Sequence, residues 1–235
     1  MTPLLVLTAL ELEARVLARE LEVPLLPAFP FPAFGHGTLR VAPVGLRATL
    51  CDSRWPPLLD GFGTPLIVSA GVCGALDPRL APADLVIPER VIDAQGASYS
   101  ISASHHHEVL SRLATPACTD PLITTNRVVA TTEAKAALFA SSGAAAVDME
   151  SVTIVARAAR SGYPALVVRA ISDDSRQSLP PELVGLVDSE GRLRVARALA
   201  LTVTRPMTLP SALELGRRTR RALRAVARVL AGLIA

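Results

Sequence analysis

Residues 145–174 read AAVDMESVTIVARAARSGYPALVVRAISDD, and this stretch decides the fold class. An apolar run over residues 145–149 is followed by a helical pattern over residues 150–160. The most apolar run of the chain comes next, over residues 166–171. A strand, a helix and a second strand in this order form the repeating unit of parallel sheets. We therefore expect residues 166–171 to form a strand that is covered on both faces.

The same alternation of short apolar runs and helical patterns extends toward the N-terminus. Further strands are predicted at residues 4–7, 39–44, 66–69, 85–91 and 128–131, and further helices at residues 11–21 and 133–141. The pattern predicts an α/β fold of three layers, in which helices flank a central mixed, largely parallel sheet. A length of 235 residues suits one domain, so we expect a single domain over residues 1–235 with a C-terminal extension from about residue 179.

The C-terminal extension differs in composition from the rest of the chain. Prolines punctuate it at Leu179-Pro180-Pro181, Arg205-Pro206 and Leu209-Pro210, and a long helix is predicted from residue 211 to near the end. That helix has an apolar stripe made of Leu223, Val226, Leu230 and Leu233. Its remaining surface is basic, with arginines at positions 217, 218, 220, 221, 224 and 228.

The basic helix accounts for the positive charge of the whole chain. The formal net charge of +3 becomes −3 without these six arginines, so the charge gives no general case for nucleic-acid binding. Two interpretations of the helix stay open. It packs its stripe on the domain and exposes the arginines to solvent, or the arginines and stripe make peripheral contact with an anionic membrane.

Other features indicate an intracellular protein without metal. The N-terminal residues lack the basic segment of a signal peptide, and residues 65–76, the longest weakly polar stretch, are too short to span a bilayer. The cysteines at positions 51, 73 and 118 are far apart and have no metal-ligand spacing. We expect a cytoplasmic protein with reduced thiols, no metal and no cofactor.

Three consecutive histidines, His105, His106 and His107, have poor geometry for a metal site. Successive residues on a helix point in different directions, so these three side chains do not converge on one ion. We expect an exposed helix start or a loop at this position.

Three acidic residues follow predicted strands. Glu13 comes shortly after the first strand, Glu150 after residues 145–149, and Asp173 after residues 166–171. Ligands of open α/β sheets bind at the carboxyl ends of the strands. Each acid alone is equally explained as a helix cap, but three acids that follow separate strands indicate a binding or catalytic site.

Four motifs, in the same order, resemble a known family. They are residues 8–13 (TALELE), 70–76 (AGVCGAL) with 83–87 (ADLVI), 146–151 (AVDMES) and 168–173 (VRAISD). These motifs resemble those of the purine nucleoside phosphorylase and nucleosidase superfamily. The first is similar to the motif of its methylthioadenosine/adenosylhomocysteine nucleosidase branch. The resemblance spans about residues 3–175.

The resemblance implies roles for individual residues. Asp173 falls on the general acid that protonates N7 of the purine, because a purine anion is a poor leaving group. Glu150 falls on the carboxylate that accepts both ribose hydroxyls, and Glu13 on the acid that activates the attacking water. Met149 falls on an apolar residue against the sugar, although a plain core methionine explains it equally well. The expected substrate site is completed by Gly71, Val72, Val128 and Ser172.

Departures from the family pattern bear on the reaction. Phosphorylases of the superfamily place an arginine and a serine in and just after the third strand to hold phosphate, and Ser69 and Val72 occupy those positions here. A carboxylate at Glu13 also repels a phosphate dianion, which favours hydrolysis. Arg15 or Arg47 offers another route to a phosphate. The aromatic residue that nucleosidases place over the base is replaced near residues 126–128.

The resemblance thus implies hydrolysis of the N-glycosidic bond of a purine nucleoside, with adenine and a 5′ substituent as the expected case. A phosphate-dependent phosphorylase and a nucleoside-binding protein without turnover are the alternatives. The C-terminal third resembles the hopanoid-associated phosphorylase subgroup, which is implicated in removing adenine from adenosylhopane, a lipid nucleoside. That resemblance is the ground for the membrane interpretation. The expected partners are a small-molecule nucleoside and a second copy of the chain in a homodimer.

Overall fold

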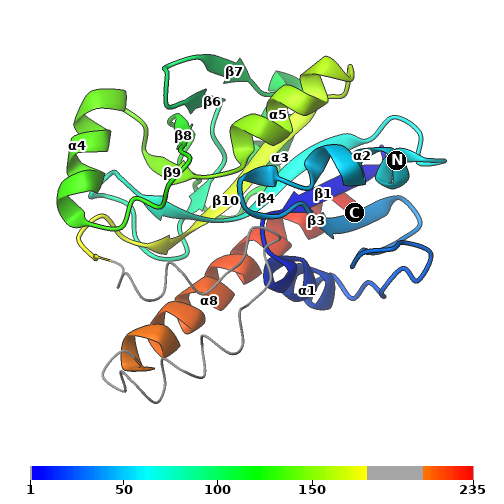
Figure 1. Ribbon diagram of the computed structural model, residues 1–235, viewed down its shortest axis with the longest axis horizontal. Coiled ribbons are helices and arrows are strands. Elements are labelled where there is room, and N and C mark those ends of the chain that lie inside the picture. The colour runs from blue at the N-terminus through cyan, green and yellow to red at the C-terminus, as the bar shows by residue number, and fades with distance from the viewer. Residues whose placement is uncertain (1, 179–208, 235) are drawn as a thin grey trace.

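The computed structural model describes residues 2–178 and 209–234, which form a mixed sheet with helices on both faces (Figure 1). The order of eight strands across the sheet is β2-β3-β1-β4-β9-β8-β6-β7, and β10 pairs with β4 and β5. The strands are β1 (Leu4–Thr8), β2 (Phe34–His36), β3 (Leu39–Pro43), β4 (Leu66–Ala75), β5 (Leu85–Val86), β6 (Arg90–Asp93), β7 (Ser98–Ser100), β8 (Leu122–Thr124), β9 (Ala146–Asp148) and β10 (Ala165–Asp173). The predicted α/β fold class is confirmed.

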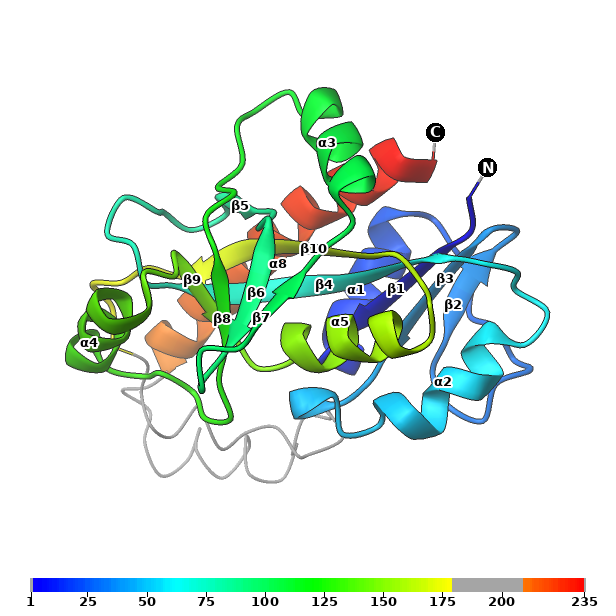
Figure 2. The same ribbon diagram turned by 90° about the horizontal axis from the view of Figure 1, so that it is seen from above.

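Helices cover the sheet on both sides (Figure 2). One face carries α1 (Glu11–Glu20) and the long α8 (Leu209–Ile234), and α5 (Ser151–Arg160) lies on the opposite face. The remaining helical segments of the described chain are η1 (Leu46–Ala48), α2 (Cys51–Leu59), α3 (Ala103–Arg112) and α4 (Thr132–Ser142). The predicted helices at residues 11–21, 133–141 and 150–160 are confirmed within one residue at each end.

Strands β4 and β10 form the centre of the sheet. They run parallel from the pair Ile67 and Ala165 to the pair Gly74 and Asp173, with an irregularity between Ile171 and Asp173. Every residue of β10 is buried, as its apolar sequence predicts. The carboxyl ends of β1, β4 and β10 therefore lie in one region of the molecule.

The direction of the strands reverses next to this centre. Strand β9 is antiparallel to β4, with Val147 opposite Gly74, and it is parallel to β8. The sheet thus contains two groups of parallel strands, β3-β1-β4-β10 and β9-β8-β6, which meet in antiparallel orientation at β4 and β9. Because β9 runs back along β4, the chain after β9 returns toward the middle of β10.

Three strand predictions are corrected by the pairing of the sheet. Strand β4 continues beyond the predicted residues 66–69 as far as Ala75, because β10 pairs with it along this length. Residues 85–91 form two strands, β5 and β6, separated by Pro88, which has no backbone N–H to donate. Residues 128–131 form no strand. The paired strand is β8, and Thr131 instead caps α4 by accepting a hydrogen bond from the N–H of Ala134.

The histidine triplet lies in the first half of α3. His106 is buried and its Nε2 lies 2.8 Å from the carbonyl oxygen of Ile87, whereas His105 Nδ1 lies 2.7 Å from Ser102 Oγ. The predicted helix start is confirmed, but the expectation of an exposed segment is wrong for His106. Its side chain is held in the core by a backbone acceptor that lies far away in the sequence.

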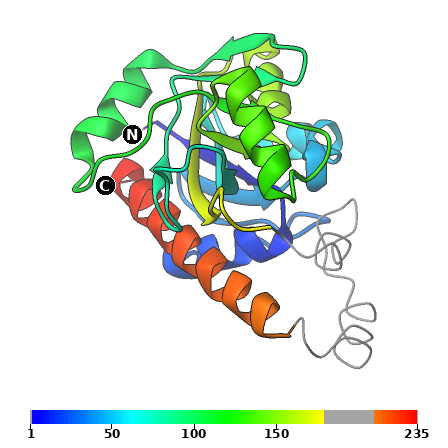
Figure 3. The ribbon, with the colours of Figure 1, turned by 90° about the vertical axis from the view of Figure 1, so that its left-hand side faces the viewer.

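Helix α8 packs across the face of the sheet beside α1 (Figure 3). The stripe residues Leu223, Val226 and Leu230 are fully buried, so they are not available for insertion into a bilayer. The packing interpretation of the helix is confirmed, and five of its six arginines are exposed. No helix in residues 2–178 and 209–234 is long and apolar enough to span a membrane. The proline motifs at Leu179-Pro180-Pro181 and Arg205-Pro206 lie outside the described residues.

The burial of α8 predicts a large stability cost for truncating its stripe. Leu223→Ala should lower the free energy of unfolding by about 2–5 kcal/mol, because it leaves a cavity in the core. Arg220→Gln on the exposed side of the same helix is the matched control and should change it by less than about 0.5 kcal/mol. Urea denaturation measures both. Equal midpoints for the two variants would show that the stripe does not pack as described.

Candidate active site

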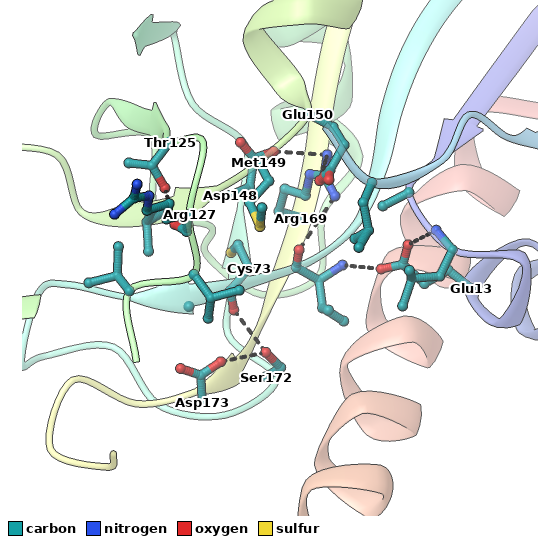
Figure 4. Close-up of a pocket in the computed structure, with 18 residues that line it drawn as sticks. Glu13, Cys73, Thr125, Arg127, Asp148, Met149, Glu150, Arg169, Ser172 and Asp173 are labelled. Atoms are coloured by element: carbon teal, nitrogen blue, oxygen red, sulfur yellow. Dashed lines mark hydrogen bonds and ion pairs between the residues drawn. The ribbon is translucent and has the colours of Figure 1, made fainter. Parts of the chain in front are cut away.

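A cavity of about 200 Å³ opens where β9 meets β4 and β10 (Figure 4). Its walls come from the start of α1, η1, the carboxyl-terminal half of β4, the segment after β8, β9 with the turn that follows it, and the second half of β10. Of the residues predicted for the site, the cavity is lined by Glu13, Val72, Val128, Met149, Glu150, Ser172 and Asp173. The remaining predicted residue, Gly71, lies against the carboxylate of Glu13.

A buried arginine lies at the base of the cavity. Arg169, in the middle of β10, is fully buried, and its Nη2 lies 2.8 Å from Asp148 Oδ2. The same nitrogen donates to Ser69 Oγ at 2.8 Å and to Ser151 Oγ at 3.2 Å. Burial lowers the pKa of Arg169, but the neighbouring carboxylates outweigh it and raise the pKa above its usual value. The guanidinium is therefore a permanent positive charge.

Asp148 is saturated by protein donors. Its Oδ2 accepts from the backbone N–H of Ser151 and forms the ion pair with Arg169, and its Oδ1 accepts from Thr124 Oγ1 at 2.6 Å. With these contacts filled, Asp148 serves as the counter-ion of Arg169 and as a cap of α5. Of the carboxylates around the cavity, it is the one with the least capacity left for a ligand.

Glu150 is buried at the N-cap of α5 and faces the cavity. Its Oε1 accepts from the backbone N–H of Arg47 at 2.9 Å, and its Oε2 lies 4.0 Å from Arg169 Nη2. Burial, reinforced by the charge of Asp148, raises the pKa of Glu150 well above its usual range, although Arg169 opposes the shift. Its side chain makes no capping hydrogen bond to α5, so the helix-cap explanation does not account for it.

Glu13 is 2% exposed and joins α1 to β4. Its Oε2 accepts from the N–H of Leu10 at 2.9 Å, and its Oε1 accepts from the N–H of Val72 at 3.0 Å. The first contact is the helix-cap role that sequence alone allowed, and the second holds the carboxylate at the cavity. Burial raises the pKa of Glu13, and the charge of Arg169 partly opposes this.

Asp173 ends β10 with both oxygens held. Ser172 Oγ lies 2.7 Å from Oδ1, and Lys135 Nζ lies 2.6 Å from Oδ2. Asp173 is 5% exposed and lines the cavity on the side opposite Glu13 (Figure 4). The acid predicted from sequence is thus in the site, together with a lysine that the sequence analysis did not single out.

The upper wall of the cavity is formed by the segment after β8. Thr125, Arg127, Val128 and Val129 line it, with no aromatic side chain among the residues that line the described cavity. Of the two arginines that sequence offered for a phosphate, neither lines the cavity. Arg15 pairs with Glu11 on the exposed side of α1, and Arg47 meets the site through its backbone N–H to Glu150.

The sequence analysis quoted Arg169 and Asp148 within its motifs but gave them no role, and it missed Lys135. Charged residues in apolar or buried segments are the signal that was available, because such groups are rarely buried without a partner. Arg169 interrupts the most apolar run of the chain. Lys135 carries no such signal, because its alanine-rich helix has no distinct apolar face that would predict which residues are buried.

A preformed cavity at the reversal of strand direction in an α/β sheet is typical of a small-molecule site. The chain belongs to the phosphorylase superfamily, whose family model matches residues 57–204. No curated protein sequence matches the chain significantly.

Solved structures share the fold along the whole chain. The Neisseria meningitidis 5′-methylthioadenosine/S-adenosylhomocysteine nucleosidase, in complex with methylthio-immucillin-A, has a TM-score of 0.72 at 15% identity, covering 100% of this chain and 99% of that one. Futalosine hydrolase of Helicobacter pylori has a TM-score of 0.72 at 15% identity, covering 99% and 97%. A putative nucleosidase of the first type from Francisella philomiragia has a TM-score of 0.72 at 16% identity, covering 100% and 99%.

Gly71 provides the space for the charged groups at the base of the cavity. A Cβ at this position would lie 2.6 Å from Glu13 Oε1 and 2.8 Å from Arg169 Nη1, and the backbone φ is +145°. Gly71→Ala should therefore displace both side chains and reduce ligand binding at the cavity, with a stability cost of about 1–3 kcal/mol for the strained backbone. Gly216→Ala on α8, where a Cβ meets no atom within 4 Å, is the control. Isothermal titration with adenosine and thermal denaturation measure the two effects, and unchanged binding by Gly71→Ala would contradict the arrangement.

Proposed function

We propose that the protein is a purine nucleosidase, which hydrolyses the N-glycosidic bond of a nucleoside with adenine and a 5′ substituent as the expected substrate. The observation that carries the proposal is the convergence of Glu13, Glu150 and Asp173 on one cavity from three separate parts of the chain. A binding protein needs the contact to ribose, but it has no use for an acid and a base on opposite sides of the ligand. Membership of the superfamily supports the same class of substrate.

The sugar binds at Glu150. A carboxylate presents two oxygens at a separation that suits the vicinal 2′ and 3′ hydroxyls of ribose. Oε1 is already oriented by the N–H of Arg47, so the side chain is preorganised before the ligand arrives. Met149 supplies apolar contact beside it.

The base departs toward Asp173. As the bond between C1′ and the purine nitrogen breaks, its electron pair goes to the base, and a proton from Asp173 to N7 neutralises the developing anion. Water then attacks C1′ on the other face, and Glu13 accepts the proton that the water loses. The two carboxyl groups thus exchange their protonation states in one turnover, and release of products and proton exchange with solvent restore them.

The charge balance of the cavity favours water over phosphate. Asp148 pairs directly with the guanidinium of Arg169, so the positive charge at the base of the cavity is already compensated. A phosphate dianion entering this region would meet no free cation there, and ionised Glu13 would repel it. The three similar solved structures described above are of proteins named nucleosidases or hydrolases, which supports the same reaction type.

Phosphorolysis is the second candidate, and one feature favours it. Nε of Arg169 is buried without a hydrogen-bond partner among the described residues, so part of a cationic group is unused. Incubation of the protein with adenosine, 5′-methylthioadenosine, S-adenosylhomocysteine and inosine, with and without phosphate, separates the candidates. We expect free ribose or its 5′-substituted form in both buffers. A reaction that stalls without phosphate and yields a sugar 1-phosphate would establish the phosphorylase.

The raised pKa of Glu13 predicts the acid side of the pH profile. Glu13 accepts a proton only as a carboxylate, so kcat should fall as the pH drops through its pKa, with a midpoint above the usual value of 4.5. Glu13→Gln should lower kcat by roughly 100- to 10,000-fold and change this acid limb, to which the raised pKa of Glu150 also contributes. Steady-state rates at saturating substrate between pH 4 and pH 9 measure it. A variant that keeps the acid limb of the wild type would show that another group is responsible.

A further inference from the structure

Helix α4 is attached to the domain through a charged residue. Lys135 is the single buried residue of this helix, and its side chain is fully inaccessible to solvent. Its ammonium group has three N–H bonds and three acceptors, which are Oδ2 of Asp173 at 2.6 Å and the carbonyl oxygens of Asp174 at 2.7 Å and Gln177 at 3.0 Å. The group is completely satisfied, and it is directed at the acid of the site.

Stability alone does not account for this ion pair. Removing an ammonium and a carboxylate from water costs several kcal/mol per ion, and apolar side chains of similar volume often stabilise a protein at least as well. A lysine at this position is explained better by the electrostatic effect of its positive charge on the carboxyl group of Asp173. The backbone carbonyls of Asp174 and Gln177 hold the ammonium in place, so its position does not depend on the protonation state of Asp173.

We propose that Lys135 is a positioning residue that increases the ability of Asp173 to deliver its proton to the leaving base. The inference rests on the proposed nucleosidase function. When the O–H bond of Asp173 breaks and the proton moves to the purine nitrogen, a carboxylate remains. The ammonium 2.6 Å from Oδ2 stabilises that carboxylate without any reorganisation, since it is already in place.

The same contact fixes the direction of the acid. Oδ2 is held by Lys135 and Oδ1 by Ser172, whose hydroxyl also lies 3.2 Å from the carbonyl oxygen of Cys73. The carboxyl group is therefore held at Oδ2 by Lys135 of α4 and at Oδ1 by Ser172 of β10. Gly74 leaves the space for this arrangement, because a Cβ there would lie 3.2 Å from Oδ2.

A pair of substrates separates this role from a structural one. Adenosine or 5′-methylthioadenosine needs protonation of its base, whereas 4-nitrophenyl β-D-ribofuranoside releases a stable anion that needs no proton. Lys135→Met removes the charge and keeps a flexible side chain of similar length. We expect kcat for the purine nucleoside to fall roughly 100-fold, the effect of losing one preorganised electrostatic contact, with little change in KM. The rate with the nitrophenyl riboside should stay as in the wild type.

Two further variants complete the test. Lys135→Met in an Asp173→Asn background should cause no additional loss, because both changes remove the same proton transfer. Glu133→Gln, on the exposed side of α4, should leave both substrates unaffected. Thermal denaturation of each variant shows whether it is folded.

The possible failures can be told apart. Equal losses of kcat with both substrates, or no loss with the purine nucleoside, would overturn the role of Lys135 while leaving the nucleosidase function in place. A further loss caused by Lys135→Met in the Asp173→Asn background would also overturn it. A wild-type protein that cleaves none of the purine nucleosides would instead refute the proposed function itself.

Discussion

The ion pair between Arg169 and Asp148 is the interaction on which the rest of the site depends. Both side chains are almost completely buried, and their closest atoms lie 2.8 Å apart. A buried guanidinium without this partner would be strongly unfavourable, and so would the cluster of carboxylates without the guanidinium. The pair therefore makes it possible to keep Glu13 and Glu150 at the same cavity, because each also experiences the charge of Arg169.

The reversal of strand direction brings these groups together. Arg169 lies in the middle of β10, and Asp148 reaches it because β9 runs antiparallel to β4. In a sheet with all strands parallel, the residues after β9 would lie at the far end of β10, beside Asp173. The antiparallel junction instead places Glu150 near the middle of β10, at the same cavity as Glu13 and Asp173.

The site contains two buried cations, each paired with a carboxylate. Arg169 is surrounded by several carboxylates at the base of the cavity. Lys135 has one carboxylate partner and two backbone carbonyls, and it lies beside Asp173 at the end of β10. Each cation is held by protein groups that do not change during a reaction, so both are preorganised in the sense that electrostatic catalysis requires.

The sequence by itself determined the α/β class and the three acids of the site. It also determined the strands at residues 4–7 and 166–171, the helix that follows the strand at residues 4–7, and the helix that precedes the strand at residues 166–171. These features follow from local hydrophobic patterns and from motifs within single segments, which need no knowledge of distant residues. Only the tertiary structure decided that residues 122–124 and not 128–131 form a strand, that His106 is buried, and that Lys135 reaches Asp173. In each case the deciding partner lies 19 or more residues away in the chain, as Ile87 does for His106 and Asp173 for Lys135. A local pattern contains no record of such partners, because burial of a polar group is set by what the fold places opposite it.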